Sequence, residues 1–233
     1  MSGSPSSFLG KAMRILRSRP TRFLLTVRGW FLFKATRWLS RIFPLPGVVL
    51  GKNVRLQRLR CLMAEAPEAS IHIQDHTIIY ENARIEAYEK GMIQIGDCSI
   101  LGDIRIQARE RIQIGKRFLS SWNVFISDFE PHPIEADLRG FQVEMMVEQF
   151  RPRFAGAHSD NALSTRWTSK AWAFPKEAIE IGDDVWVGAN ATILKGAKIG
   201  KGCIVATGSV VIRGTYPEHS VLAGNPAKVV KTI

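Results

Sequence analysis

The chain has 233 residues, enough for one sizeable domain with an extension, and a formal net charge of +11. The positive excess is confined to residues 1–64, which hold 13 Lys and Arg and no acidic residue, so a generic nucleic-acid binder with a basic folded surface is excluded. The three cysteines lie far apart without pairing or metal-ligand spacing, which is typical of a reducing compartment and predicts no metal site.

Residues 1–46 are expected to form a basic amphipathic helical extension. Between residues 8 and 43, large apolar side chains are interleaved with nine Lys and Arg, and Pro20 favours a break between two helices. No run of about 18 uncharged apolar residues occurs, so no transmembrane helix is expected. The composition is typical of a helix lying on an anionic membrane surface. A helix that caps the end of a repeat domain or packs within an oligomer is the alternative.

Residues 47–225 are expected to form one repeat domain. Its first part contains residues at six-residue spacing in four triples, although an ordinary β-sheet with alternating Ile is the alternative there. The triples are Leu50, Leu56 and Leu62; Ile73, Ile79 and Ile85; Ile95, Leu101 and Gln107; and Ile114, Ser120 and Ile126. The next triple begins 67 residues later, which predicts a long excursion loop over about 129–178.

One histidine stands apart from the other four. His132 lies at the root of this excursion in SDFEPHPIEADLRG, between two prolines that stiffen the backbone. A loop anchored on a rigid scaffold is a common position for reactive groups. Surface or structural roles are expected for His72, His76, His158 and His219.

The last part of the domain repeats every six residues, as IGDDVW–VGANAT–ILKGAK–IGKGCI–VATGSV–V from Ile181. An aliphatic residue opens each block, and a short side chain such as Val185 or Ala191 recurs four places later. This period matches one flat face of a triangular coil, and three blocks make a coil of 18 residues. The sequence therefore predicts a solenoid of about six coils, followed by a C-terminal tail over 226–233.

The run from IGDDVWVGAN through ATGSVV to AGNPAKVV resembles the hexapeptide-repeat acyltransferases, and more closely the sugar O-acetyltransferases that include maltose and galactoside acetyltransferases and exopolysaccharide and O-antigen acetylases. HPIEADLR is similar to the H-P-x-x-x-x-x-R stretch that carries the catalytic histidine there. The resemblance is strong over 179–233, fair over 50–139, and absent over the first 45 residues and most of 140–178. It implies a mainly β fold, a left-handed parallel β-helix, and a homotrimer with active sites between protomers.

The resemblance also implies an acetyl-CoA-dependent O-acetyltransferase that needs no metal. His132 would be the general base that removes the proton of a sugar hydroxyl as it attacks the thioester. The acceptor would be a precursor of a cell-surface polysaccharide (lipopolysaccharide, capsule or exopolysaccharide). The enzyme would then be cytoplasmic, bound peripherally to the inner face of the cytoplasmic membrane. The insertion over 140–178 hints at a larger or lipid-linked glycan acceptor; a disordered or trimer-wrapping arm is the alternative.

Coenzyme contacts are implied residue by residue. The backbone at Ala189 and Ala206 would contact the pantetheine arm, and Asn225 and Pro226 would shape the adenine end. The cations that would meet the coenzyme phosphates are Arg213, Lys228 and Lys231. For Lys231, a solvated charge in the tail is the alternative.

Acceptor contacts are implied with alternatives. Trp186 would wall the pantetheine or acceptor site, unless it is a packing residue. Asp103 aligns near a small polar residue of the family, and Asp128 would orient His132 or bind acceptor, unless it is a turn residue.

Three other functions remain open from the sequence. An N-acetyltransferase acting on an amino-sugar nucleotide would use the same coil and the same base. A metalloenzyme resembling the γ-carbonic anhydrases would need three converging histidines, and only His132 lies near the right coil. A non-catalytic scaffold would leave His132 and the coenzyme-like C-terminal elements without a role.

Overall fold

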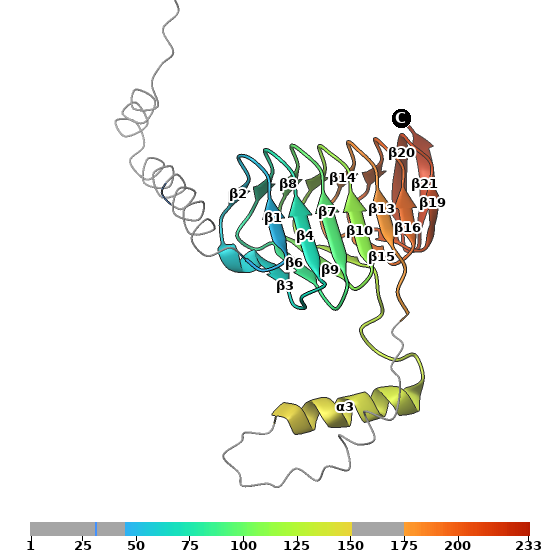
Figure 1. The fold of residues 1–233 in the computed structure, drawn as a ribbon. Coiled ribbons are helices and arrows are strands. Elements are labelled where there is room, and N and C mark those ends of the chain that lie inside the picture. The colour runs from blue at the N-terminus through green and yellow to red at the C-terminus, as the bar shows by residue number, and fades with distance from the viewer. Residues whose placement is uncertain (1–30, 32–44, 151–174) are drawn as a thin grey trace, which may run out of the picture.

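In a computed structural model, residue 31 and residues 45–150 and 175–233 are described. They form a three-sided solenoid of parallel strands, with one helix standing beside it (Figure 1). Each coil contributes one strand to each of three sheets, called sheets A, B and C in chain order. Six coils are complete and a seventh has two strands, which confirms the predicted number of about six.

All strand pairs along the solenoid are parallel and one coil apart. Sheet A contains β1 (Val48–Leu50), β4 (Ser70–Ile73), β7 (Met92–Ile95), β10 (Arg111–Ile114), β13 (Ile179–Ile181), β16 (Ala197–Ile199) and β19 (Gly214–Tyr216). Sheet B contains β2 (Arg55–Leu56), β5 (Ile78–Ile79), β8 (Ile100–Leu101), β11 (Leu119–Ser120), β14 (Trp186–Val187), β17 (Ile204–Val205), β20 (Ser220–Gly224) and β21 (Ala227–Thr232). Sheet C contains β3 (Leu62–Ala64), β6 (Arg84–Ala87), β9 (Ile104–Ala108), β12 (Val124–Ser127), β15 (Thr192–Leu194) and β18 (Val210–Val211).

The core consists of columns of aliphatic side chains, one residue from each coil. In sheet A the column includes Ile73, Ile95, Ile114 and Ile181, all nearly inaccessible to solvent. The short residues four places after each opener are also buried, because they fill the corners of the triangle. Each coil covers apolar surface only against its neighbours, so stability depends on stacking.

One inward position predicted from the six-residue spacing is wrong. Ile106, rather than Gln107, continues the sheet C column between Ile85 and Ile126. The corner between β8 and β9 is one residue shorter than in the next coil. The strand therefore reaches the core after five residues, and the side chain of Gln107 points outward.

The edge between sheets A and B repeats one backbone conformation in every coil. The residue there has a positive φ between 54° and 67°, and only one of the seven is glycine. The seven are Asn53, His76, Cys98, Arg117, Asp184, Gly202 and His219. His76 and His219 are therefore turn residues, in agreement with their expected structural roles.

A glycine follows the inward isoleucine in several coils for a different reason. A Cβ on Gly115 would lie 2.5 Å from Asp183 Oδ1 and 2.6 Å from its backbone nitrogen, and a Cβ on Gly182 would lie 2.6 Å from the nitrogen of Lys201. No side chain fits between coils that approach so closely.

The outer faces of the sheets differ in character. One outward ladder of sheet B is apolar along most of the solenoid, and we call it the sheet B stripe; it consists of Ile78, Ile100, Leu119, Trp186, Ile204 and Val221. The corresponding ladder of sheet A is polar from the second coil on, with His72, Gln94, Gln113, Glu180, Lys198 and Thr215.

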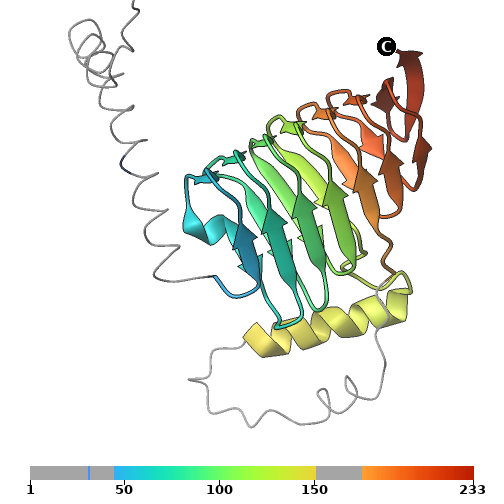
Figure 2. The same cartoon turned by 45° about the horizontal axis from the view of Figure 1, so that its top comes forward.

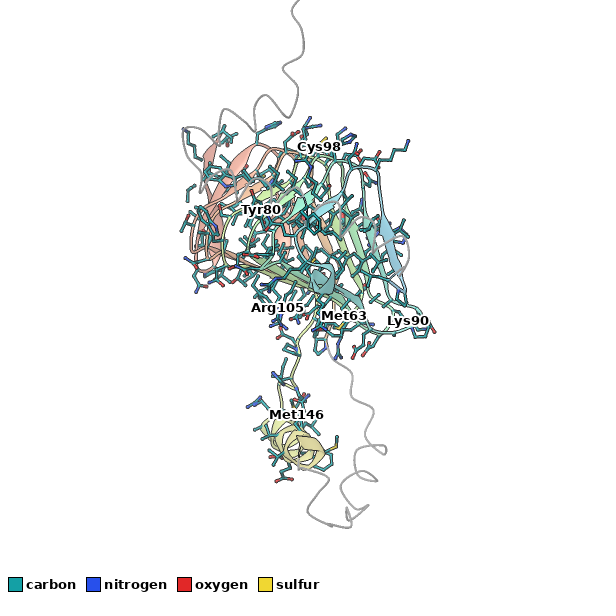
Figure 3. All side chains as sticks on the ribbon, turned by 90° about the vertical axis from the view of Figure 1, so that its left-hand side faces the viewer. Met63, Tyr80, Lys90, Cys98, Arg105 and Met146 are labelled. Atoms are coloured by element: carbon teal, nitrogen blue, oxygen red, sulfur yellow. The ribbon has the colours of Figure 1, made fainter. Side chains whose placement is uncertain are left out.

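The excursion between β12 and β13 contains a helix that the sequence analysis expected only as loop. This helix, α3 (Ala136–Phe150), lies beside the solenoid, beyond the edge where sheet C leads into sheet A (Figures 1 and 2). The sequence gives α3 no clear amphipathic pattern, and Gly140 lies in its second turn. In the end-on view, Met146 identifies helix α3 (Figure 3). Met63 and Arg105 of sheet C lie on the side of the solenoid that faces this helix.

Two further segments complete the chain. A short 3-10 helix, Leu59–Cys61, links β2 to β3. Residues expected as a C-terminal tail include β21, which pairs antiparallel with β20 and closes that end of sheet B. In the described part of the chain, no helix is long and apolar enough to cross a membrane. The expected helical extension over 1–46 and His158 lie outside the described residues, apart from residue 31 and residues 45 and 46.

Candidate active site

The histidine excursion leaves the solenoid through a narrow two-stranded neck. Phe129 and Lys176 form an antiparallel bridge, and the Glu130 N–H donates to the carbonyl of Pro175 at 2.9 Å. The Glu177 N–H donates to the carbonyl of Asp128 at 2.8 Å. His132 is thus held two residues beyond a paired backbone, at the edge of the prism between sheet C and sheet A, which we call the C–A edge.

Asp128 anchors this neck to the preceding coil. Its buried carboxylate accepts the backbone N–H of Arg109 at 2.8 Å through Oδ1 and that of Glu110 at 3.0 Å through Oδ2. Burial raises the pKa of Asp128 above its ordinary value, against the opposing effect of these backbone donors. The described bonds of this carboxylate thus go to the backbone, as the turn-residue alternative predicts, and none of them joins it to His132.

Aromatic packing supports the same neck. Phe129 is buried, and the ring of Tyr88 meets it edge-on at a centroid distance of 6.0 Å. The guanidinium of Arg109 lies 4.7 Å from the centroid of the Phe129 ring and pairs with Glu89 at 3.1 Å. The base of the histidine loop is therefore fixed by packing as well as by backbone hydrogen bonds.

His132 itself is exposed, but its ring has a partner on α3. Nδ1 of His132 lies 2.8 Å from Oε1 of Gln142, and Gln142 Nε2 donates to the carbonyl of Pro131 at 3.4 Å. Arg139, the arginine of the H-P-x-x-x-x-x-R stretch, donates from Nη1 to the carbonyls of Pro133 at 3.0 Å and Ile134 at 2.8 Å. Helix α3 therefore holds the loop on both sides of the histidine.

Charged pairs connect the neck to later coils along the C–A edge. Lys195 Nζ lies 2.5 Å from Oε1 of Glu130, and Arg213 Nε donates to Oε2 of Glu177 at 2.6 Å. The Glu177 pair raises the pKa of the exposed Arg213 guanidinium above its ordinary value. Arg213 is thus brought to the same edge as His132, a proximity that the sequence alone did not reveal.

The other candidate residues lie elsewhere on the prism. Asp103, Ala189 and Ala206 are at the B–C edge, where sheet B leads into sheet C, and Trp186 is on the outer face of sheet B with 46% of its surface exposed. The turn and strand that end the solenoid carry the remaining four, namely Asn225, Pro226, Lys228 and Lys231. Sheet C separates the B–C edge from the C–A edge, so one chain does not bring these two groups together.

Four residues of the site were not found by sequence reasoning. Gln142 is separated from His132 by ten positions and belongs to a helix that the sequence did not predict. The remaining three, Glu130, Glu177 and Lys195, take part in ion pairs between the neck and later coils. These pairs depend on the pairing of the two strands of the neck, which the sequence does not show.

Residues 178–213 match the family model described as bacterial transferase hexapeptide (six repeats). A putative lipopolysaccharide biosynthesis O-acetyl transferase, WbbJ of Escherichia coli (strain K12), is 29% identical over 184 residues, which cover 78% of this chain and 81% of that protein. A probable acetyltransferase, Rv3034c of Mycobacterium tuberculosis (strain ATCC 25618 / H37Rv), is also 29% identical, over 88% of this chain but only 56% of that protein.

A solved structure with a similar fold is that of AntD, an N-acyltransferase from Bacillus cereus, in complex with dTDP and 3-hydroxybutyryl-CoA. Its TM-score is 0.52 at 15% identity, with 84% of this chain and 87% of that chain covered. At this identity the likeness concerns the fold alone. Among the residues that the structure describes, no three His, Cys, Asp or Glu side chains are grouped as metal ligands.

Proposed function

Because the chain belongs to the hexapeptide-repeat acyltransferases, we propose that it transfers the acetyl group of acetyl-CoA to a hydroxyl of a sugar in a cell-surface polysaccharide precursor. The observation that carries this proposal is the placement of His132, exposed on a loop whose base is fixed by backbone pairing and whose imidazole is oriented from α3. The similarity to the E. coli putative lipopolysaccharide biosynthesis O-acetyl transferase supports a lipopolysaccharide precursor as the acceptor class.

The reaction needs one base and no covalent enzyme intermediate. Nε2 of His132 would take the proton of the sugar hydroxyl while its oxygen attacks the thioester carbonyl carbon. The tetrahedral intermediate then collapses with cleavage of the carbon–sulfur bond. The imidazolium returns the proton to the leaving thiolate, so that the products are a sugar ester and free coenzyme A.

Assembly into a homotrimer would complete the site. Candidate coenzyme residues lie at the B–C edge and on sheet B, whereas His132 lies at the C–A edge of the same chain. A neighbouring protomer can supply the missing edge in a closed cyclic assembly. The sheet B stripe supports such an interface, because an apolar ladder that runs along most of a sheet and exposes Ile100, Leu119 and Trp186 is a typical contact surface.

Acetyl-CoA would lie along the groove between protomers. Arg213, Lys228 and Lys231 carry the positive charge that the coenzyme phosphates require, and Ala189 and Ala206 leave the backbone accessible to a narrow pantetheine arm. Trp186 has an exposed indole beside this path.

Residues 8–43 would hold the enzyme at the inner face of the cytoplasmic membrane. Their nine Lys and Arg would each contribute about 1 kcal/mol near an anionic leaflet. Since this attraction is screened by salt, a high-salt wash should release the protein from membranes. Retention through the wash would rule out an electrostatic attachment.

The function is tested by release of free coenzyme A from acetyl-CoA with a panel of sugar acceptors. His132→Ala should reduce the rate by about two to four orders of magnitude, as expected when a general base is lost. His72→Ala, which removes an exposed histidine from sheet A, is the control and should leave the rate unchanged. Amino-sugar nucleotides in the same panel distinguish N-acetylation from O-acetylation. Equal rates for wild type and His132→Ala would remove His132 from the mechanism.

A further inference from the structure

We infer that Gln142 is a positioning residue, which holds the imidazole of His132 in the tautomer with a proton on Nδ1 and a free lone pair on Nε2. The catalytic meaning of this inference rests on the proposed function, whereas the tautomer itself does not. Gln142 belongs to α3, so the excursion helix would be part of the catalytic apparatus rather than only an arm on the acceptor side.

The orientation of the Gln142 amide determines the tautomer. A glutamine amide has a donor end and an acceptor end, and here Nε2 donates to the carbonyl of Pro131 at 3.4 Å. Oε1 consequently faces Nδ1 of His132 at 2.8 Å. Because a carbonyl oxygen only accepts, Nδ1 must carry the proton. Nε2 is then the nitrogen that can accept a proton from a substrate.

The amide is held in place by burial and by a neighbouring anchor. Gln142 is 6% exposed, so it has few alternative partners in water. Arg139 lies three positions earlier, on the same face of α3, and donates to the carbonyls of Pro133 and Ile134. Helix α3 thus binds residues 131–134 through two side chains, and a shift of the helix would move the imidazole with it.

A neutral partner has a chemical advantage over a carboxylate at this position. A carboxylate opposite Nδ1 would favour the imidazolium, which cannot act as a base. An amide fixes the same tautomer without adding charge. Other charged groups of this loop are Glu130, which is paired with Lys195, together with Glu135, Asp137 and Arg139.

The first test reads the tautomer directly and needs no substrate. In full-length protein with 13C- and 15N-labelled histidine, the signal of His132 is identified by its loss in His132→Ala. Its ring shifts should report the Nδ1–H tautomer in the wild type. Gln142→Met, of similar length but without an acceptor, should shift the ring toward the Nε2–H form that predominates in water. An Nε2–H tautomer in the wild type, or no change in Gln142→Met, would overturn the inference.

The second test separates positioning from structure by kinetics with an acceptor that the wild type acetylates. Gln142→Met should lower kcat by about 10- to 100-fold, the range typical when the partner that orients a functional imidazole is removed. KM for acetyl-CoA should not change. Gln142→Glu keeps an acceptor oxygen, so it should restore most of kcat at alkaline pH while its acidic limb moves to higher pH.

A matched control and the remaining outcomes complete the design. Glu144→Gln changes an exposed residue of α3 and should alter neither the tautomer nor kcat. Full kcat in Gln142→Met, or a loss in Gln142→Met that Gln142→Glu does not restore at any pH, would contradict a positioning role. A wild type with the Nδ1–H tautomer that transfers acetyl to no acceptor would refute the proposed function alone.

Discussion

The carboxylate of Asp128 accepts the backbone N–H of Arg109 from the preceding coil at 2.8 Å, and so joins two coils where the histidine loop begins. Its second oxygen accepts the N–H of Glu110. This relationship gives the acidic residue four positions before the proposed base a structural role, since both oxygens are already engaged and the side chain is fully buried.

Replacement of Asp128 by Asn should destabilise the protein. The amide can replace only one of the two acceptor oxygens and leaves a buried N–H without its partner, which costs about 1–3 kcal/mol. Asp183→Asn is a suitable control, because Asp183 accepts a single backbone N–H, that of Lys116, and its side chain is partly exposed. Thermal unfolding at equal protomer concentration measures both. Equal effects of the two substitutions would contradict this account.

The raised pKa of Asp128 also predicts a pH dependence. Between the ordinary value of 3.8 and the raised native value, the folded state binds this proton more tightly than the unfolded state does. The contribution of Asp128 to the free energy of unfolding should therefore fall as pH rises through that interval. The free energy of unfolding of the wild type minus that of Asp128→Asn, measured from pH 4 upward, should decrease as pH rises. An increase of this difference with pH would show that the pKa of Asp128 is lowered instead.

Leu119→Arg should disrupt the proposed trimer. Leu119 lies in the sheet B stripe between Ile100 and Trp186, and a buried unpaired guanidinium at an interface costs several kcal/mol. Light scattering after size exclusion should therefore give a smaller species. Gln113→Arg places the same side chain on the polar face of sheet A and should leave the assembly unchanged. A trimer that persists in Leu119→Arg would remove this face from the interface.

Arg213→Ala should weaken the binding of acetyl-CoA. Its exposed guanidinium pairs with Glu177 near the excursion neck, so it has a fixed place from which to meet a phosphate. Because exposed ion pairs contribute up to about 1 kcal/mol, KM for acetyl-CoA should rise about 2- to 5-fold with little change in kcat. Lys198→Ala on sheet A is the control. A loss in kcat alone would place Arg213 outside the phosphate site.

Two glycines should respond to alanine in opposite directions. In Gly115→Ala the new Cβ meets the backbone of Asp183, so the thermal midpoint should fall by an amount equivalent to about 1–3 kcal/mol. In Gly140→Ala the Cβ meets nothing within 4 Å, and α3 should gain about 1 kcal/mol from the better helix former. Hydrogen exchange of α3 measures the second effect. Equal losses in both variants would contradict the close approach between coils.

The periodic part of the fold could be read from the residues themselves. The columns through Ile181, Val187 and Ile193 were predicted because every six-residue block repeats the same local requirement. Where the local pattern changed, the prediction failed. The corner before Ile106 is one residue shorter than the six-residue spacing requires. The excursion contains a helix that was not predicted, since its sequence has Gly140 and no clear amphipathic pattern.

The sequence by itself determined the solenoid, the position at which its period is interrupted, and the histidine at that interruption. These are local properties, because each coil is built from neighbouring residues with the same spacing. Only the tertiary structure decided which side chains meet that histidine. Gln142 contacts Nδ1 of His132 because α3 folds back onto the histidine loop. Arg213 lies at the same edge because it follows Glu177 by two coils of the stacked solenoid and pairs with it. Such contacts depend on the closing of the chain in space, which no spacing along the sequence encodes.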